Sequence, residues 1–578
     1  MSVPPEAASS ALLPADLLIV NAKIVDVVRL RTYLGWVSVR GDQLQYVEEG
    51  APPPGLQAAQ TLDLGGQFLA PGLIDAHMHI ESSLVTPRRF QQAALPHGTT
   101  TVLADPHELA NVFGAAGVSY TLEASEHLAL RVYLAIPSCV PATDFTLETS
   151  SGTIGEADVR ALADHPRVLA LGEVMDYRGL ASPGSRLPAI VRAAQEKGLL
   201  IEGHTPTLSG TVLSDYAAHG VLSDHTLSTP AKLLEQLSKG FTVMLQEKSL
   251  NRDVLAALRE LPDRSRVLLV TDDVMPNRLT GGHLSHILRA AVRQGLDVLE
   301  AIAMATLRPA MYLGLRHLGL IAPGRQADLL VLPDLDTFRP SRVYVAGKEV
   351  YPNLPPLPPN PPAPRGGEIS RPLTRPQDFL LPLRNGPHSL AVIGMNGRNT
   401  YTTLGYEAQH LQGGQTGDPT LTQVAALQRA GSRPPSQALL RGLGLRSGAF
   451  ATTLAHDSHN LLVFGQSAAE MSRAANLLIG AGHSGAGGGM VFVDGPETHF
   501  LPLELGGIVS DAPLEVTAAL FERIEAALRL RGVTHLNPLL FLSIFSLSVS
   551  PAYKLSDLGL LDVEGRRLLP LEQLLPRP

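Results

Sequence analysis

The chain of 578 residues contains one cysteine, Cys139. A single thiol cannot form an intrachain disulfide, and it cannot supply the several thiolates of a structural zinc site. Any metal ion in this protein must therefore be held by histidine, aspartate and glutamate side chains.

Excess basic charge and long apolar runs are also missing. The net charge is -8, which leaves no electrostatic footprint for nucleic acid. No apolar run reaches the length of about 20 residues that spans a membrane. The first residues, Met-Ser-Val-Pro-Pro-Glu, lack the basic and apolar regions of a signal peptide. We therefore expect no nucleic-acid or membrane partner and a cytoplasmic location.

The hydrophobic content of 44% is enough for several domains with ordinary cores. Residues 17–28 and 35–48 read as short strands, and 327–350 reads the same way. These segments flank a long α/β stretch. The pattern predicts one composite, β-sandwich-like domain built from both flanks, residues 1–68 plus 316–352.

Residues 69–315 alternate apolar, β-branched segments with amphipathic helical ones, for example Arg186–Lys197 and Leu284–Met304. Eight candidate strands can be counted: Leu69–Ile80, Thr100–Asp105, Arg131–Pro137, Val168–Val174, Leu199–His204, Val221–His225, Phe241–Gln246 and Arg266–Asp272. Eight β/α units over roughly 250 residues are what a (β/α)8 TIM barrel needs. A doubly wound sheet is the alternative, but no Gly-rich dinucleotide turn follows the first strand.

The segment after the composite domain is rich in proline. Residues 353–374 include the run Leu-Pro-Pro-Leu-Pro-Pro-Asn-Pro-Pro-Ala-Pro, which reads as a stiff linker because proline donates no hydrogen bond to a strand. Residues 375–578 mix strand and helix patterns and predict a C-terminal α+β domain.

Ionisable side chains recur where the predicted strands end. His77 and His79 are two residues apart, and alternate strand residues point to one face. The strand ends of a TIM barrel converge on one face, where the active site lies. The other strand-end residues are Asp105, His107, Glu108, Glu173, His204, His225, Asp272 and Asp273. The pattern predicts one shared metal site.

Two ions fit this number of ligands better than one. His77, His79 and Asp272 can hold the first ion, His204 and His225 the second, with Glu173 as the bridge between them. The ligand types suit Mn²⁺, with Fe²⁺ and Zn²⁺ as alternatives. Such a site makes hydroxide available near neutral pH, and Asp272 is the candidate that moves its proton. The reaction class is hydrolysis at an electrophilic carbon.

Several residues have roles that the pattern leaves open. Asp105, His107, Glu108 and Asp273 can support the ligands, contact the substrate or hold an additional ion. His97 reads as a loop residue. His456 and His459 lie far along the chain, and we interpret them as structural, with closure over the pocket as the alternative.

Longer motifs resemble the adenine deaminase family of the amidohydrolase superfamily. Pro71–Ser83 is similar to that family's first-strand signature and Pro96–Asn111 to its second. Further similar segments are Gly203-His204, Ser223–His225, Val270–Asp273, Glu300–Ala310, Ile321–Asp328, Thr453–Asn460 and Pro551–Asp557. The His-x-His pair fits the whole superfamily, and the following Glu81-Ser-Ser83 is the part of the first motif that most favours the adenine deaminase family.

The resemblance implies conversion of adenine to hypoxanthine and ammonia by attack of metal-bound hydroxide on C6, with manganese or iron, in purine salvage. Glu81 is then a second catalytic candidate beside Asp272, through substrate contact or support of the ligands. No lysine lies on the fourth strand, which argues against a cyclic amidase. A homodimer is the default assembly.

Three positions depart from the family pattern: Thr226 where we expect an acidic residue, Gln246 where we expect Arg, and Ala430 where we expect His. None belongs to the proposed ligand set, but all three are positions that could contact the substrate. Two alternatives therefore remain: an amidohydrolase acting on another purine-like heterocycle, and a catalytically silent purine-binding paralogue.

Overall fold

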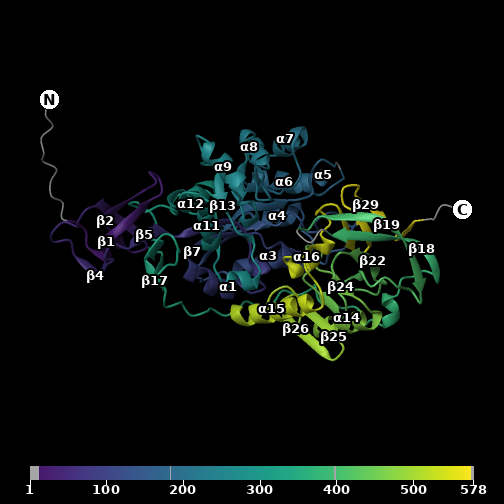
Figure 1. Ribbon diagram of the computed structural model, residues 1–578. Helices are drawn as coiled ribbons and strands as arrows, with labels where there is room; N and C mark the ends of the chain where they lie inside the picture. Colours follow the sequence, from purple (N-terminus) through teal and green to yellow (C-terminus); the bar gives the residue numbers. More distant parts are fainter. Residues whose placement is uncertain (1–11, 183, 396–398, 574–578) are drawn as a thin grey trace.

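The computed structural model describes residues 12–182, 184–395 and 399–573. At one end of the molecule lies an eight-stranded sheet with the order β17-β16-β15-β5-β1-β2-β3 and β4 beside β1 (Figure 1). Its strands are β1 Ala15–Asp26, β2 Arg31–Arg40, β3 Gln43–Glu49, β4 Ala58–Asp63, β5 Phe68–Pro71, β15 Leu329–Leu332, β16 Arg342–Val345 and β17 Lys348–Tyr351. Antiparallel pairing of β15 with β5 joins the two flanks of the chain.

The central part is a parallel barrel, which confirms the (β/α)8 TIM barrel and excludes the doubly wound sheet. Its strands are β6 Leu73–His79, β7 Thr99–Ala104, β8 Arg131–Ile136, β9 Val168–Val174, β10 Leu200–Gly203, β11 Ser223–Asp224, β12 Thr242–Leu245, β13 Val267–Leu269 and β14 Asp272–Asp273. Strands β6 and β7 are buried along their whole length, because parallel strands are covered on both faces.

Helices surround the barrel, and short 3₁₀ turns follow three of its elements. The helices are α1 Pro87–Ala94, α2 His107–Phe113, α3 Ala115–Ala124, α4 Glu156–Leu162, α5 Tyr177–Leu180, α6 Leu187–Glu196, α7 Gly210–Ala218, α8 Pro230–Ser238, α9 Arg252–Glu260, α10 Pro276–Leu279, α11 Leu284–Arg293, α12 Val298–Met304 and α13 Leu307–Tyr312. The turns are η1 Ile80–Ser83, η2 Leu95–His97 and η3 Glu247–Ser249. Within the described residues, no helix is both long and apolar enough to span a membrane.

Three sequence expectations about element boundaries were wrong. The expected first strand, Leu69–Ile80, is two strands: β5 pairs in the flanking sheet, and only β6 enters the barrel. The expected eighth strand is also split, since β13 pairs with β12 in a three-stranded sheet while β14 pairs with β6 at the edge of a six-stranded one. The expected helix Leu284–Met304 is divided at Gly295, whose φ of +94° breaks the helix between α11 and α12.

The C-terminal part is a ten-stranded sheet with three main helices and a separate three-stranded sheet. The large sheet contains β18 Gly386–Met395, β19 Thr402–Gln412, β20 Gln415–Thr416, β21 Leu421–Leu427, β22 Ser436–Arg441, β23 Ala449–Thr452, β24 Leu461–Gly465, β25 Gly488–Asp494, β26 Glu497–Leu503 and β30 Glu572–Gln573. The other elements are η4 Pro376–Phe379, α14 Ala468–His483, α15 Leu514–Leu530, α16 Pro538–Ser543, η5 Ile544–Ser546, β27 Tyr553–Ser556, β28 Gly559–Asp562 and β29 Arg567–Leu569.

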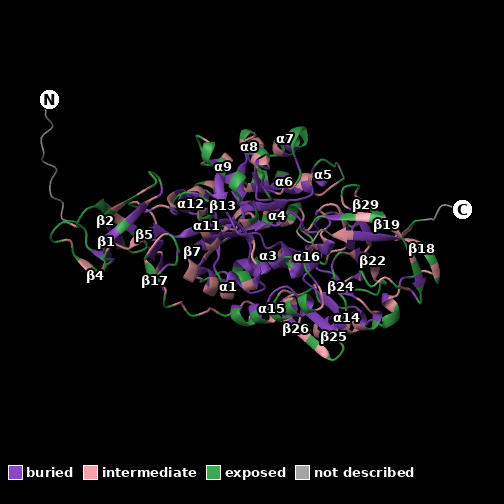
Figure 2. Ribbon diagram, viewed as in Figure 1, coloured by how far each residue is buried: buried purple, intermediate pink, exposed green. Residues whose placement is uncertain are grey.

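The C-terminal part packs on the loops that follow the barrel strands. Leu84, Leu109 and Met275, which follow β6, β7 and β14, share one hydrophobic cluster with Phe450 and Phe464 of the large sheet. Figure 2 shows buried residues continuing from the barrel through α3 to α16. The face of the barrel where the strand ends meet is therefore covered by the C-terminal part.

Arg429 is a fully buried cation at this junction. Its guanidinium donates to the carbonyl oxygens of Gly367, at 2.6 Å, and of His459, at 3.0 Å. It also donates twice to the carbonyl oxygen of Gly506, at 2.7 and 2.6 Å. One side chain thus ties three separate segments together.

Arg429→Ala is expected to destabilise the protein, because it leaves these carbonyl groups buried without donors. Each hydrogen bond to a charged group contributes about 1.5–3 kcal/mol, so the free energy of unfolding should fall by about 3 kcal/mol or more. Urea unfolding followed by fluorescence measures the change. The exposed neighbour Arg433 supplies the matched control, Arg433→Ala. Equal unfolding midpoints for the two variants would contradict the role given to Arg429.

Candidate metal centre

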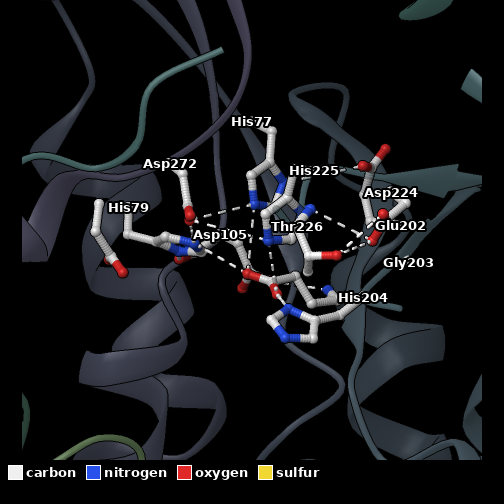
Figure 3. Close-up of polar contacts among 12 residues, drawn as sticks. His77, His79, Asp105, Glu202, Gly203, His204, Asp224, His225, Thr226 and Asp272 are labelled. Carbon is white, nitrogen blue, oxygen red and sulfur yellow. Dashed lines mark hydrogen bonds and ion pairs between the residues drawn. The ribbon is translucent and has the colours of Figure 1, made fainter. Parts of the chain in front are cut away.

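The ligand candidates come from five barrel strands. His77 and His79 end β6, Glu173 lies in β9, and Asp272 begins β14. His204 directly follows β10, and His225 directly follows β11. Figure 3 shows the side chains of His77, His79, His204, His225 and Asp272 gathered in one region. The structure thus brings together all six residues that the sequence predicts as metal ligands.

Glu173 lies between the two halves of the cluster. Its Oε1 is 3.0 Å from Nε2 of His79 and 3.4 Å from Nε2 of His77. Its Oε2 is 2.6 Å from Nδ1 of His204 and 3.3 Å from Nε2 of His225. Each carboxylate oxygen therefore faces one pair of imidazoles, which is the arrangement that a bridging ligand requires.

The two carboxylate oxygens of Asp272 have different neighbours: one faces the ligand histidines, and the other faces Gln246 and Lys248. Oδ1 lies 3.3 Å from Nε2 of His79 and 3.8 Å from Nε2 of His77. Oδ2 accepts a hydrogen bond of 2.8 Å from Nε2 of Gln246, and Nζ of Lys248 is 3.9 Å away. The carboxylate is therefore held from outside while one oxygen remains directed at the ligands.

The cluster fits a divalent cation. One ligand atom each from His77, Glu173, His225 and Asp272 lie within 4.8 Å of one another. Nε2 of His77 and Nδ1 of His225 are buried without a hydrogen-bond partner among the described residues. Buried polar atoms are rarely left unpaired, and Nε2 of His77 faces the carboxylates of Glu173 and Asp272, as a ligand of a shared cation would.

Burial and neighbouring charges set the protonation of the ligands. Burial alone would raise the pKa of Glu173, but the imidazoles around it, His225 foremost, hold it well below its usual range. Burial, together with the neighbouring His77, lowers the pKa of His225 to about 3. An ionised carboxylate and a neutral imidazole are the forms that bind metals.

Two buried carboxylates behind the ligands escaped the sequence analysis. Oε2 of Glu202 lies 3.9 Å from Nδ1 of His77 and accepts from Ser223 Oγ at 3.0 Å. Asp75 accepts from Thr271 Oγ1 at 2.6 Å and so connects β6 with the start of β14. Each precedes a ligand histidine by two residues, so strand alternation was a signal that could have found both.

The residues left open by the sequence lie around His79. The backbone oxygen of Asp105 is 3.0 Å from His79 Nδ1, and its Oδ2 accepts from the Glu173 amide at 3.1 Å. Asp273 accepts from Ser82, and Glu81 accepts from the Leu109 amide at 3.5 Å. These carboxylates therefore brace the ligand loops, while their part in catalysis stays a prediction. His97 ends η2, outside the groups of potential metal ligands.

His107 and Glu108 meet residues from the far end of the chain. Both oxygens of Glu108 are in close contact with imidazoles, Oε1 with His456 and Oε2 with His459. Both histidines lie far from the barrel residues in the sequence. No local sequence pattern shows which loop covers the barrel. The structure places them directly against α2.

The three departures from the family pattern occupy different environments. Thr226 is buried and donates to Asp224 Oδ1 at 2.9 Å, and Ala430 is exposed. Gln246 donates both to Asp272 and to the backbone oxygen of His225, the latter at 2.8 Å. Of the three, Gln246 is therefore the departure that contacts the candidate ligands.

Comparison with known proteins agrees with this geometry. The model of the amidohydrolase family matches residues 68–350, and that of the adenine deaminase C-terminal domain matches residues 401–567. An adenine deaminase of Methylobacterium nodulans is 36% identical, covering 96% of this chain and 97% of its own. Adenine deaminase 2 of Carboxydothermus hydrogenoformans is 37% identical with the same coverage, and that of Nitratidesulfovibrio vulgaris is 38% identical over 95% of each chain. A crystal structure of an adenine deaminase is 18% identical, covers 58% of this chain and 99% of its own, and has a TM-score of 0.45.

A barrel with histidine and carboxylate ligands at its strand ends defines the class of metal-dependent amidohydrolases. Within this class, sequence identity above 30% over nearly the full chain, the C-terminal part included, identifies one family. The chain belongs to the adenine deaminase family.

Proposed function

We propose that the protein hydrolyses adenine to hypoxanthine and ammonia. One observation carries the proposal: relatives named adenine deaminase are 36–38% identical over 95–96% of the chain. The ligand cluster supports it, because it gathers histidine and carboxylate groups where a barrel enzyme holds its reactants. The product is a free purine base, so we assign the reaction to purine salvage.

The reaction replaces the C6–N bond of adenine by a C6–O bond, with water as the source of oxygen. Divalent cations, when bound by the histidines, Glu173 and Asp272 of the cluster, would supply Lewis acidity and hydroxide near neutral pH. Asp272 is placed to take the proton of the attacking water and deliver it to the departing amino nitrogen, which leaves as ammonia. We propose manganese as the metal, with iron or zinc as alternatives that the same ligand types accept.

A second candidate is an amidohydrolase that acts on another purine-like heterocycle. Gln246 favours it, because this departure from the family pattern contacts Asp272 directly. A neutral amide at this position gives the candidate proton carrier a different environment from that of a cation. A homodimer and a cytoplasmic location stay predictions from the sequence.

Ammonia release should distinguish these candidates. We expect protein purified with Mn²⁺ to release ammonia from adenine and not from adenosine, guanine or cytosine. The metal content of the same sample is measured, and chelator-treated protein is the control. Turnover of a different base alone would favour the second candidate. A fully metallated protein that turns over none of the four would be a silent purine-binding paralogue.

A further inference from the structure

A second buried cluster lies beside the metal ligands, and the proposed proton transfer does not use it. It consists of His107 and Glu108 from α2, and of His456 and Asp457 from the loop between β23 and β24. Nε2 of His107 is 3.5 Å from Glu108 Oε1 and 3.9 Å from Asp457 Oδ1. The four residues are at most 5% exposed.

The cluster adjoins the place where the reaction occurs. The ring centroids of His107 and His79 are 4.3 Å apart. Ligand atoms of His79, His107 and Glu173 also lie within 4.8 Å of one another. A molecule held by His107 and its neighbours would therefore be in reach of the metal centre.

Several polar atoms of the cluster and its surroundings have no partner. Among the described residues, buried atoms without a hydrogen bond include His107 Nδ1, His456 Nε2, Asp457 Oδ2, Glu81 Oε2 and Asp105 Oδ1. Leaving such a group unpaired costs about 1–3 kcal/mol, so a concentration of them in one region indicates a polar ligand.

On the side of His459, the cluster is held by contacts with other residues of the chain. Nε2 of His459 contacts Glu108 Oε2, and the His459 carbonyl accepts from Arg429. The Ala455 amide donates to Nδ1 of His459 at 3.3 Å. The loop that carries His456 and Asp457 is thus anchored, and its unpaired atoms are held in fixed positions.

We propose that His456 and Asp457 recognise the imidazole edge of the purine base, so that the C-terminal part of the chain sets specificity. The inference rests on the proposed function. That edge carries one N–H and one nitrogen lone pair, which match a carboxylate oxygen and an imidazole N–H. A sugar on the ring nitrogen would replace the N–H that Asp457 accepts from, so the site is expected to take the free base.

Kinetics with ring-substituted substrates tests the proposal. A site built to hydrogen-bond a substrate N–H rejects an analogue without it by about 10⁴-fold. The wild type should therefore discriminate against 9-methyladenine to that extent. Asp457→Ala should lower kcat/KM for adenine by about 10–100-fold, mainly through KM, at unchanged metal content. It should also raise kcat/KM for 9-methyladenine, because the carboxylate that this analogue leaves unpaired is gone, so the discrimination between the two substrates falls. Asp457→Asn keeps the shape of the side chain and should show the same direction.

Asp557→Asn is the matched control. Asp557 is also a buried carboxylate at the contact with the barrel, but it accepts from the amide of Thr149 at 2.9 Å and from Gln428 at 3.0 Å. This variant should keep the discrimination of the wild type. Melting temperatures show whether each variant is folded.

The possible results separate the two proposals. A wild type that is active on adenine, with normal KM and discrimination in both Asp457 variants, would overturn the inference alone. Loss of one metal ion per chain in these variants would overturn it as well, because the cluster would then hold a cation. A fully metallated wild type without adenine turnover would instead remove the proposed function.

Discussion

Glu173→Ala is expected to remove metal binding from both halves of the ligand cluster and to lower adenine turnover by at least about 1,000-fold. Replacing a residue that only supports a ligand already costs about 10–100-fold in metal affinity. Glu173 directs one oxygen at His77 and His79 and the other at His204 and His225. Its loss therefore affects every imidazole of the cluster. Elemental analysis of the purified variant measures the metal, and ammonia release measures the turnover.

Glu202→Gln gives the comparison for this variant. Glu202 is equally buried, but among the candidate ligands it lies near His77, from the side opposite Glu173. Its replacement should weaken metal binding by about 10–100-fold and leave protein that regains activity when metal is added. If Glu173→Ala retained two ions per chain, or behaved like Glu202→Gln, the bridging role would be lost.

Strand periodicity explains why much of the metal centre could be predicted. In a parallel barrel, a ligand needs only to end a buried strand, and strand ends are visible as polar residues after apolar runs. His77, His79 and Glu173 follow this rule. Strand alternation, rather than the strand ends, would have identified Glu202 and Asp75, which lie two residues before ligand histidines.

The boundaries of the first and eighth strands depended on distant partners. The segment around Gly72 reads as one continuous strand, yet Phe68–Pro71 pairs with β15, more than 250 residues later in the chain. A Cβ atom at Gly72 would overlap the side chain of Thr100, which explains the glycine where the chain passes between sheets. No local pattern contains this information.

The second buried cluster was beyond sequence analysis for a similar reason. Its two halves, residues 107–108 and 456–457, come from a barrel helix and from a loop of the C-terminal sheet. Neither segment has a periodic pattern that predicts the other as its neighbour. The contact depends on how two large parts pack, through apolar residues such as Leu109 and Phe450.

Asp272→Asn is expected to keep the metal and to lower kcat for adenine by at least about 100-fold, the usual scale for loss of general acid–base catalysis. The amide has the same shape, so one oxygen can still face His79. It cannot accept a proton, because an amide is not basic near neutral pH. The measurements are kcat, KM and metal content of the same preparation.

The neighbouring Asp273→Asn separates loss of the proton carrier from loss of charge. Asp273 accepts from Ser82, so its replacement removes the same charge beside the cluster but should cause a smaller decrease in kcat. A fall in kcat for Asp272→Asn without a rise in KM would mean that the carboxylate acts in the transition state rather than in binding adenine. Near-normal kcat at full metal content would show that another group, with Glu81 as the first candidate, moves the proton.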